Sequence, residues 1–161
     1  MFMNCEINKF NGFENFESIL VTIDMFKYAN ISNNALPKID FKNIIVADEM
    51  FLGANVKFAD YLNLEKLKSG KRMFDNASIH SKLFEKDIIL PKIEDATLMF
   101  ANTIIAPNFQ LNIDTISMPE CKSADQMFSN SNLITSIKRL DMCRKHTQCT
   151  IENMFYGSTI E

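Results

Sequence analysis

The sequence predicts an α/β solenoid, a single coil of short repeated units that each contain one strand and one helical turn. The main sign is the dipeptide Met-Phe, which occurs seven times in 161 residues. Successive copies start 24, 25, 23, 26, 28 and 27 residues apart, at Met1, Met25, Met50, Met73, Met99, Met127 and Met154. A period of this length is typical of repeat proteins, in which each unit packs mainly against its neighbours. We therefore expect one domain, residues 1–161, with about seven units of 23–28 residues.

Residues at fixed distances from each Met support the repeat and predict a helical turn at its centre. The fourth residue after each Met is small: Cys5, Ala29, Ala54, Ala77, Thr103, Ser131 and Ser158. The sixth residue is a branched aliphatic: Ile7, Ile31, Val56, Ile79, Ile105, Leu133 and Ile160. The fourth residue before the Met is a good helix N-cap in four units: Ser69, Asp95, Ser123 and Thr150. We expect a short helical turn that begins at this cap and points its Met and Phe into the core.

A second apolar pattern precedes the Met by eleven, nine and six residues. Its members are Ile39, Phe41 and Ile44, then Leu62, Leu64 and Leu67, then Ile88, Leu90 and Ile93, then Ile116, Met118 and Cys121. Alternation of period two over the first two positions indicates a strand whose intervening residue points outward. The strands of stacked units are expected to line one concave face, with the helical turns on the other.

The C-terminal part departs from this pattern. Lys145 and Gln148 occupy positions where apolar residues are expected, so the sequence predicts an irregular insertion near 140–150. The last unit would expose apolar groups that a neighbouring unit normally covers, namely Met154, Phe155 and Ile160. A homodimer or a partner is expected to cover them. The alternative is that the segment Leu140–Thr150 folds back as a cap.

Composition and charge argue against several classes of protein. The net charge of −3 lacks the basic field of a general nucleic-acid binder. No apolar run approaches the roughly 20 residues of a membrane span, and Glu6 and Lys9 interrupt the N-terminal segment. We therefore predict a cytoplasmic protein that does not contact a membrane.

The four cysteines are expected to be reduced thiols, because the predicted compartment is reducing. Cys143, His146 and Cys149 form a Cys-x2-His-x2-Cys run, and Cys121 could supply a fourth ligand for zinc. This spacing matches no zinc pattern with a mechanistic basis. Whether these residues bind metal stays open, and no metal site is predicted.

The segment 39–55, which contains Met50 and Phe51, resembles the Met-Phe repeats of bacterial surface lipoproteins. It is also similar to the BspA-type leucine-rich repeats, whose helix carries Ala-Phe in the equivalent place. The resemblance covers essentially the whole chain. It implies a leucine-rich-repeat solenoid with a role in adhesion or protein binding. The chain departs from surface members of the family in having no predicted export signal.

No catalytic constellation stands out in the sequence. His80 follows an inward-pointing aliphatic and is expected at a surface bend, while His146 lies in a basic stretch with Lys138, Arg139, Arg144 and Lys145. The four glycines are not clustered into a phosphate-binding loop. We therefore predict a protein that is not an enzyme and has no cofactor and no small-molecule substrate.

The sequence instead favours a scaffold that binds a protein or a ribonucleoprotein. The predicted contact residues are the outward strand positions and the basic segment: Asn15, Glu17, Asp40, Lys42, Asn63, Glu65, Ile89, Pro91, Ser117, Pro119, Arg144, Lys145 and His146. One form of this hypothesis is an inhibitor of a bacterial protein complex, such as a phage-encoded anti-CRISPR. The alternatives are a fragment of a bacterial surface adhesin, and nucleic-acid binding through residues 138–146.

Overall fold

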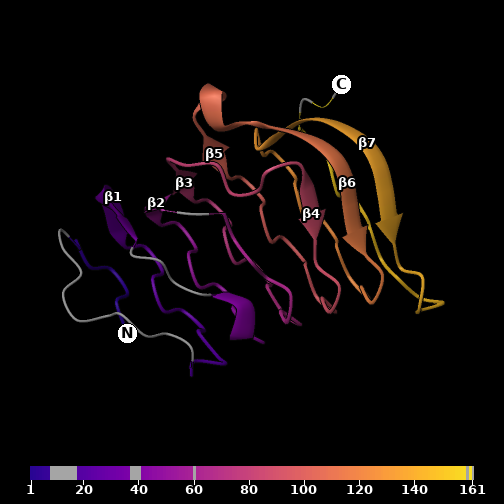
Figure 1. Cartoon of the computed structure of the whole chain (residues 1–161), viewed down its shortest axis with the longest axis horizontal. Coiled ribbons are helices and arrows are strands. Elements are labelled where there is room, and N and C mark those ends of the chain that lie inside the picture. Colours follow the sequence, from indigo (N-terminus) through magenta and orange to yellow (C-terminus); the bar gives the residue numbers. More distant parts are fainter. Residues whose placement is uncertain (8–17, 37–40, 60, 159, 161) are drawn as a thin grey trace.

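The protein is a solenoid, as the repeat predicts. The computed structural model describes residues 1–7, 18–36, 41–59, 61–158 and 160. Its chain winds along the long axis of the molecule, and each turn lies beside the next (Figure 1). Strands from successive turns pair in parallel and form two sheets.

The first sheet follows the Met-Phe corners and has the order β1-β2-β3-β5. Its strands are β1 (Asn30–Leu36), β2 (Asn55–Phe58), β3 (Ser78–Ile79) and β5 (Ile104–Ile105). The branched aliphatics six residues after each Met stand in register here: Ile31, Val56, Ile79 and Ile105. Each is at most 1% exposed, so the predicted inward turn of the chain is confirmed at these positions. Regular pairing in this sheet covers about four turns, and the count of seven units stays a prediction.

The second sheet precedes the corners and has the order β4-β6-β7. Its strands are β4 (Asp87–Ile89), β6 (Leu111–Met118) and β7 (Ile134–Met142). Two short 3-10 helices, η1 (Phe41–Asn43) and η2 (Pro107–Phe109), complete the described elements. The predicted alternation holds in this sheet, because Ile88 and Ile116 are buried and paired whereas the adjacent Ile89 points outward. β7 pairs with β6 as far as Met142, so the irregular segment begins only after that residue.

The predicted helical turns are wrong, and with them the α/β class. The described residues contain no α-helix, and each Met-Phe corner is a series of turns. In the first six corners, the backbone N–H of the Phe donates to the Met carbonyl of the next turn of the coil, as from Phe51 to Met73 at 2.8 Å. An α-helix would instead direct such N–H groups to carbonyls four residues earlier in the same segment.

The residues expected to be N-caps serve a different purpose. Ser69, Asp95, Ser123 and Thr150 follow one another in a ladder of parallel bridges between turns. Their side chains bond mainly across turns, as in the contact of 2.7 Å between the hydroxyl oxygens of Thr97 and Ser123. Small polar residues suit this ladder as well as they suit a helix start, which is why the sequence pattern was misleading.

Two left-handed residues bend each corner from Met25 onwards, and one bends the corner at Met1. The residue before the Met has a positive φ at Asp24, Glu49, Arg72, Leu98, Gln126 and Asn153. The third residue after the Met has one at Asn4, Tyr28, Gly53, Asn76, Asn102, Asn130 and Gly157. Asn and Gly adopt this conformation at lower cost than other residues, and they fill six of the seven latter positions. This was the sequence signal for turns rather than helix.

The core is built around a stack of phenylalanine rings. Successive Phe rings lie 5.2–5.4 Å apart between centroids and within 9° of parallel, from Phe2 through Phe26, Phe51, Phe74, Phe100 and Phe128 to Phe155. The five internal rings are at most 1% exposed, which confirms that the Met-Phe stripe is interior. Burying one such side chain contributes roughly 1.5–3 kcal/mol. Ala54 and Ala77, at the small position, are also buried beside the stack.

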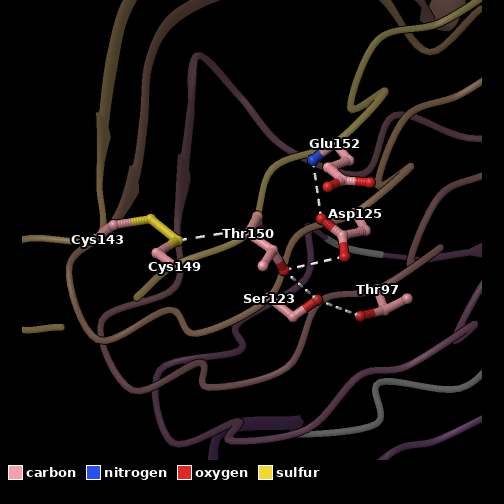
Figure 2. The surroundings of a disulfide bond; sticks show 7 residues. All are labelled: Thr97, Ser123, Asp125, Cys143, Cys149, Thr150 and Glu152. Carbon is pink, nitrogen blue, oxygen red and sulfur yellow. Dashed lines mark hydrogen bonds between the residues drawn. A yellow bond between two sulfur atoms is a disulfide. The ribbon is translucent and has the colours of Figure 1, made fainter. Parts of the chain in front are cut away.

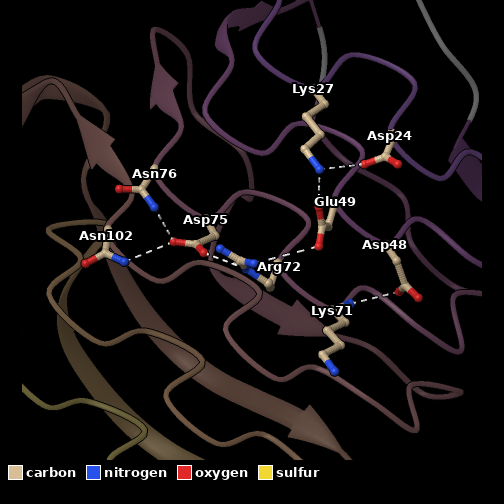
Figure 3. Close-up of polar contacts among 9 residues, drawn as sticks. All are labelled: Asp24, Lys27, Asp48, Glu49, Lys71, Arg72, Asp75, Asn76 and Asn102. Carbon is tan, nitrogen blue, oxygen red and sulfur yellow. Dashed lines mark hydrogen bonds and ion pairs between the residues drawn. The ribbon is translucent and has the colours of Figure 1, made fainter. Parts of the chain in front are cut away.

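Polar side chains link the corners across the turns (Figure 3). Lys27 pairs with Asp24 at 3.1 Å and with Glu49, and these two carboxylates raise the pKa of its ammonium. The carboxylate of Asp75 is almost fully buried and accepts hydrogen bonds from Arg72 Nε at 2.9 Å, Asn76 Nδ2 at 2.7 Å and Asn102 Nδ2 at 2.9 Å. Asp75 therefore ties its own corner to the next one.

Candidate partner-binding surface

Four of the predicted contact residues line one open hollow. Asn63, Glu65, Ile89 and Pro91 surround a depression of about 530 Å³, together with Tyr61, Leu62, Leu64, Phe84 and Asp87. Asn63, Glu65 and Ile89 are exposed, and the Ile89 side chain is 49% accessible. Apolar and charged groups therefore share one surface, a mixture typical of protein interfaces.

The row continues from this hollow along the second sheet. Ile89 of β4 pairs with Ser117 of β6, and the Ser117 carbonyl accepts the N–H of Leu90 at 2.9 Å. Pro119 follows two residues later, and its carbonyl accepts the N–H of Lys145 at 3.1 Å. We call Asn63, Glu65, Ile89, Pro91, Ser117 and Pro119 the partner face. It leads directly to the segment after β7.

The remaining predicted contact residues are placed as follows. Lys42 lies in η1 and is exposed. Arg144 and Lys145 are exposed, and His146 is half-buried, in the segment after β7. The others, Asn15, Glu17 and Asp40, lie outside the described residues.

The segment after β7 is closed by a disulfide between Cys143 and Cys149 (Figure 2). Their Cα atoms are 5.7 Å apart, within the range that a disulfide spans. The expectation of reduced thiols is therefore wrong for this pair, because the chain folds back and brings the two residues together. Cys5 and Cys121 are free thiols, and burial raises the pKa of Cys121 to about 11.

The candidate metal ligands are not assembled. In the part of the chain that the structure describes, no three His, Cys, Asp or Glu side chains are grouped so as to hold a metal ion. Two of the four sulfur atoms are already joined in the disulfide, and Cys121 lies in the core.

We expect the disulfide to be detectable chemically. Protein purified without reductant, unfolded and then alkylated should carry two alkyl groups, on Cys5 and Cys121. Prior reduction should raise the number to four, the full cysteine content. Mass spectrometry of the intact chain distinguishes these states, and four labels without reductant would show that the pair is not oxidised.

Three basic residues of the segment 138–146 form ion pairs with acidic neighbours. Lys145 and Lys92 both pair with Glu120, at 2.8 and 3.1 Å, and these contacts lower the pKa of Glu120 to about 2. Arg144 pairs with Asp141, and Lys138 pairs with Asp114 at 2.6 Å. The segment 138–146 is therefore a mixed rather than a basic surface.

The Glu120 contacts predict a specific loss of stability in acid. The pKa of Glu120 is lower in the folded protein, so its contribution is complete above the unfolded value of 4.5 and is lost as the pH falls from there towards 2. Urea unfolding at several pH values in this window should show a shallower decline for Glu120→Gln than for the wild type. Glu85→Gln, at an exposed position, is the matched control and should decline like the wild type. Equal slopes for all three proteins would contradict the assignment.

The two histidines lie in different surroundings. His80 is exposed, as expected, and its Nε2 donates to Asn55 Oδ1 at 2.6 Å across the first sheet. His146 is half-buried in the segment closed by the disulfide.

Among the described residues, no helix has the length and apolar character needed to cross a bilayer.

No protein-family model, curated protein or solved structure matches the chain. The resemblance to leucine-rich repeats therefore stays a prediction, based on the sequence pattern.

Proposed function

We propose that this protein is a non-enzymatic scaffold that binds another protein through the partner face. The observation that carries the proposal is the hollow beside β4, which outward-facing residues of two successive turns line together. Parallel pairing of β4, β6 and β7 holds the backbone on the side of the hollow that carries Ile89, which makes this side rigid. A rigid surface loses little conformational entropy on binding, which favours affinity.

The disulfide favours one form of this scaffold over another. Disulfides persist mainly in oxidising surroundings such as the cell surface. The Cys143–Cys149 bond therefore supports a fragment of a surface adhesin more than a cytoplasmic inhibitor of a bacterial complex, the anti-CRISPR form included. Nucleic-acid binding through residues 138–146 is less favoured, because acidic partners neutralise Lys138, Arg144 and Lys145.

Two finer features belong to the same proposal. The solenoid is of the leucine-rich-repeat type with about seven units, which the seven Met-Phe pairs and the seven stacked rings support. A second copy of the chain covers the C-terminal end, where Tyr156 is 69% exposed and Phe155 is only half-buried. A monomeric sedimentation profile at high micromolar concentration would contradict the second feature.

Site-specific cross-linking tests the proposed surface. A photoreactive amino acid at position 89 should cross-link a specific protein from the native source. The same amino acid at position 104 is the matched control, since Ile104 is also an exposed isoleucine but lies on the first sheet. Cross-linking of the same proteins from both positions, or of none from position 89, would contradict the assignment.

A further inference from the structure

A second hollow lies on the first sheet, beside the ends of β2 and β3. It measures about 290 Å³. Its chemically distinctive lining residues are Lys57 of β2, His80 and Lys82 after β3, Tyr61, and Phe109 of η2. Tyr61 also borders the hollow of the partner face, so the two depressions are adjacent but differ in the groups that line them.

Two lysines, Lys57 and Lys82, are the charged groups among the described residues that line this hollow. Lys57 and Lys82 form no ion pair with any residue that the structure describes, whereas Lys92 and Lys145 on the second sheet are both paired with Glu120. None of the described lining residues is acidic. Two ammonium groups in one depression, neither paired with a carboxylate among the described residues, attract an anion.

Aromatic and hydroxyl groups complete the hollow. Tyr61 is 52% exposed and Phe109 is half-buried, so both present accessible ring surface. Ser81 accepts the N–H of Phe58 at 2.9 Å with its Oγ, which leaves the hydroxyl hydrogen free to donate. Exposed rings beside lysines are the combination that binds a nucleobase and its phosphate.

We infer that this hollow binds a nucleotide unit, with the base against Tyr61 and Phe109 and the phosphate against Lys57 and Lys82. A chain of single-stranded nucleic acid and a free mononucleotide share this chemistry. The site shares Tyr61 with the hollow beside β4, but it contains none of the six residues of the partner face and lies outside residues 138–146.

Isothermal titration with adenosine monophosphate, adenosine and inorganic phosphate tests the inference. The monophosphate should bind at least about tenfold more tightly than either part alone, because only it uses both the rings and the lysines. The double variant Lys57→Ala/Lys82→Ala should remove this advantage over adenosine. Tyr61→Ala should lower the affinity for the monophosphate at least about fivefold, and Tyr61→Phe should preserve this affinity.

The controls distinguish binding at this hollow from nonspecific attraction of the anion to surface lysines. Lys71→Ala and Lys86→Ala remove two exposed lysines that lie outside the hollow and should leave the affinity within about twofold. A labelled single-stranded RNA decamer distinguishes a nucleic-acid chain from a free mononucleotide as the ligand. If the decamer binds more tightly than the monophosphate, and the double variant loses this binding, the ligand is a nucleic-acid chain. Equal or weaker binding of the decamer indicates a free nucleotide. No binding of the monophosphate at millimolar concentration, or binding unaffected by the three hollow substitutions, would overturn the inference.

Discussion

Replacing Phe100 with Ala should lower the free energy of unfolding by about 3–5 kcal/mol. Its ring is fully buried and stacks between Phe74 and Phe128, at centroid distances of 5.2 and 5.4 Å. Both neighbours are held by backbone bonds between turns, so they cannot collapse into the space that the ring leaves. The cavity therefore remains, and its cost adds to the lost transfer free energy. Chemical denaturation monitored by circular dichroism measures the effect.

Phe155→Ala is the matched control for this experiment. Phe155 stacks on Phe128 in the same geometry, but it is only half-buried. We expect the free energy of unfolding to fall by less than about 2 kcal/mol, because folding removes less apolar surface from contact with water at this position. Near-wild-type stability of Phe100→Ala, or equal losses in the two variants, would mean that the stack does not form the core.

Replacing Asp75 with Ala should cost about 2–3 kcal/mol, because three hydrogen bonds to a buried carboxylate disappear together. Its acceptor oxygens bind Arg72, Asn76 and Asn102, and the last of these belongs to the next corner. The substitution leaves the donors of all three residues without this partner, and all three residues keep a left-handed backbone. Urea unfolding of the purified variant gives the measurement.

Asp114→Ala provides the comparison for a surface carboxylate. Asp114 pairs with Lys138, whose side chain is 77% accessible, and such pairs contribute between about 0 and 1 kcal/mol. An Asp75→Ala variant as stable as Asp114→Ala would show that the corner network does not hold neighbouring turns together.

The sequence was most informative where the repeat determines packing. Met-Phe recurs with the period of the coil, so equivalent side chains must stack, and the buried rings of Phe74 and Phe100 follow from spacing alone. The aliphatic at the sixth position, such as Val56 or Ile79, entered the sheet for the same reason. The outward position of Ile89 followed from alternation along β4, and Asn63 is exposed as predicted although the expected strand at residues 62–64 is absent.

Features that depend on contacts between turns were harder to infer. Ser69 and Ser123 are good helix caps by residue type, but their backbone pairs with neighbouring turns instead. Asn76 and Asn102 carried the sign of left-handed turns, which apolar periodicity does not detect. The disulfide depends on how the chain returns after β7, and no spacing rule relates Cys143 to Cys149.

The affinity for the cross-linked partner is the most direct test of the partner face. Ile89→Asp places a charge in the centre of that face, and Ile104→Asp makes the same change on the first sheet. Both side chains are exposed, so both variants should remain folded, which circular dichroism can verify. We expect Ile89→Asp to raise the Kd at least about tenfold and Ile104→Asp to change it less than about twofold. Equal effects of the two substitutions, or a larger effect at Ile104, would contradict the account.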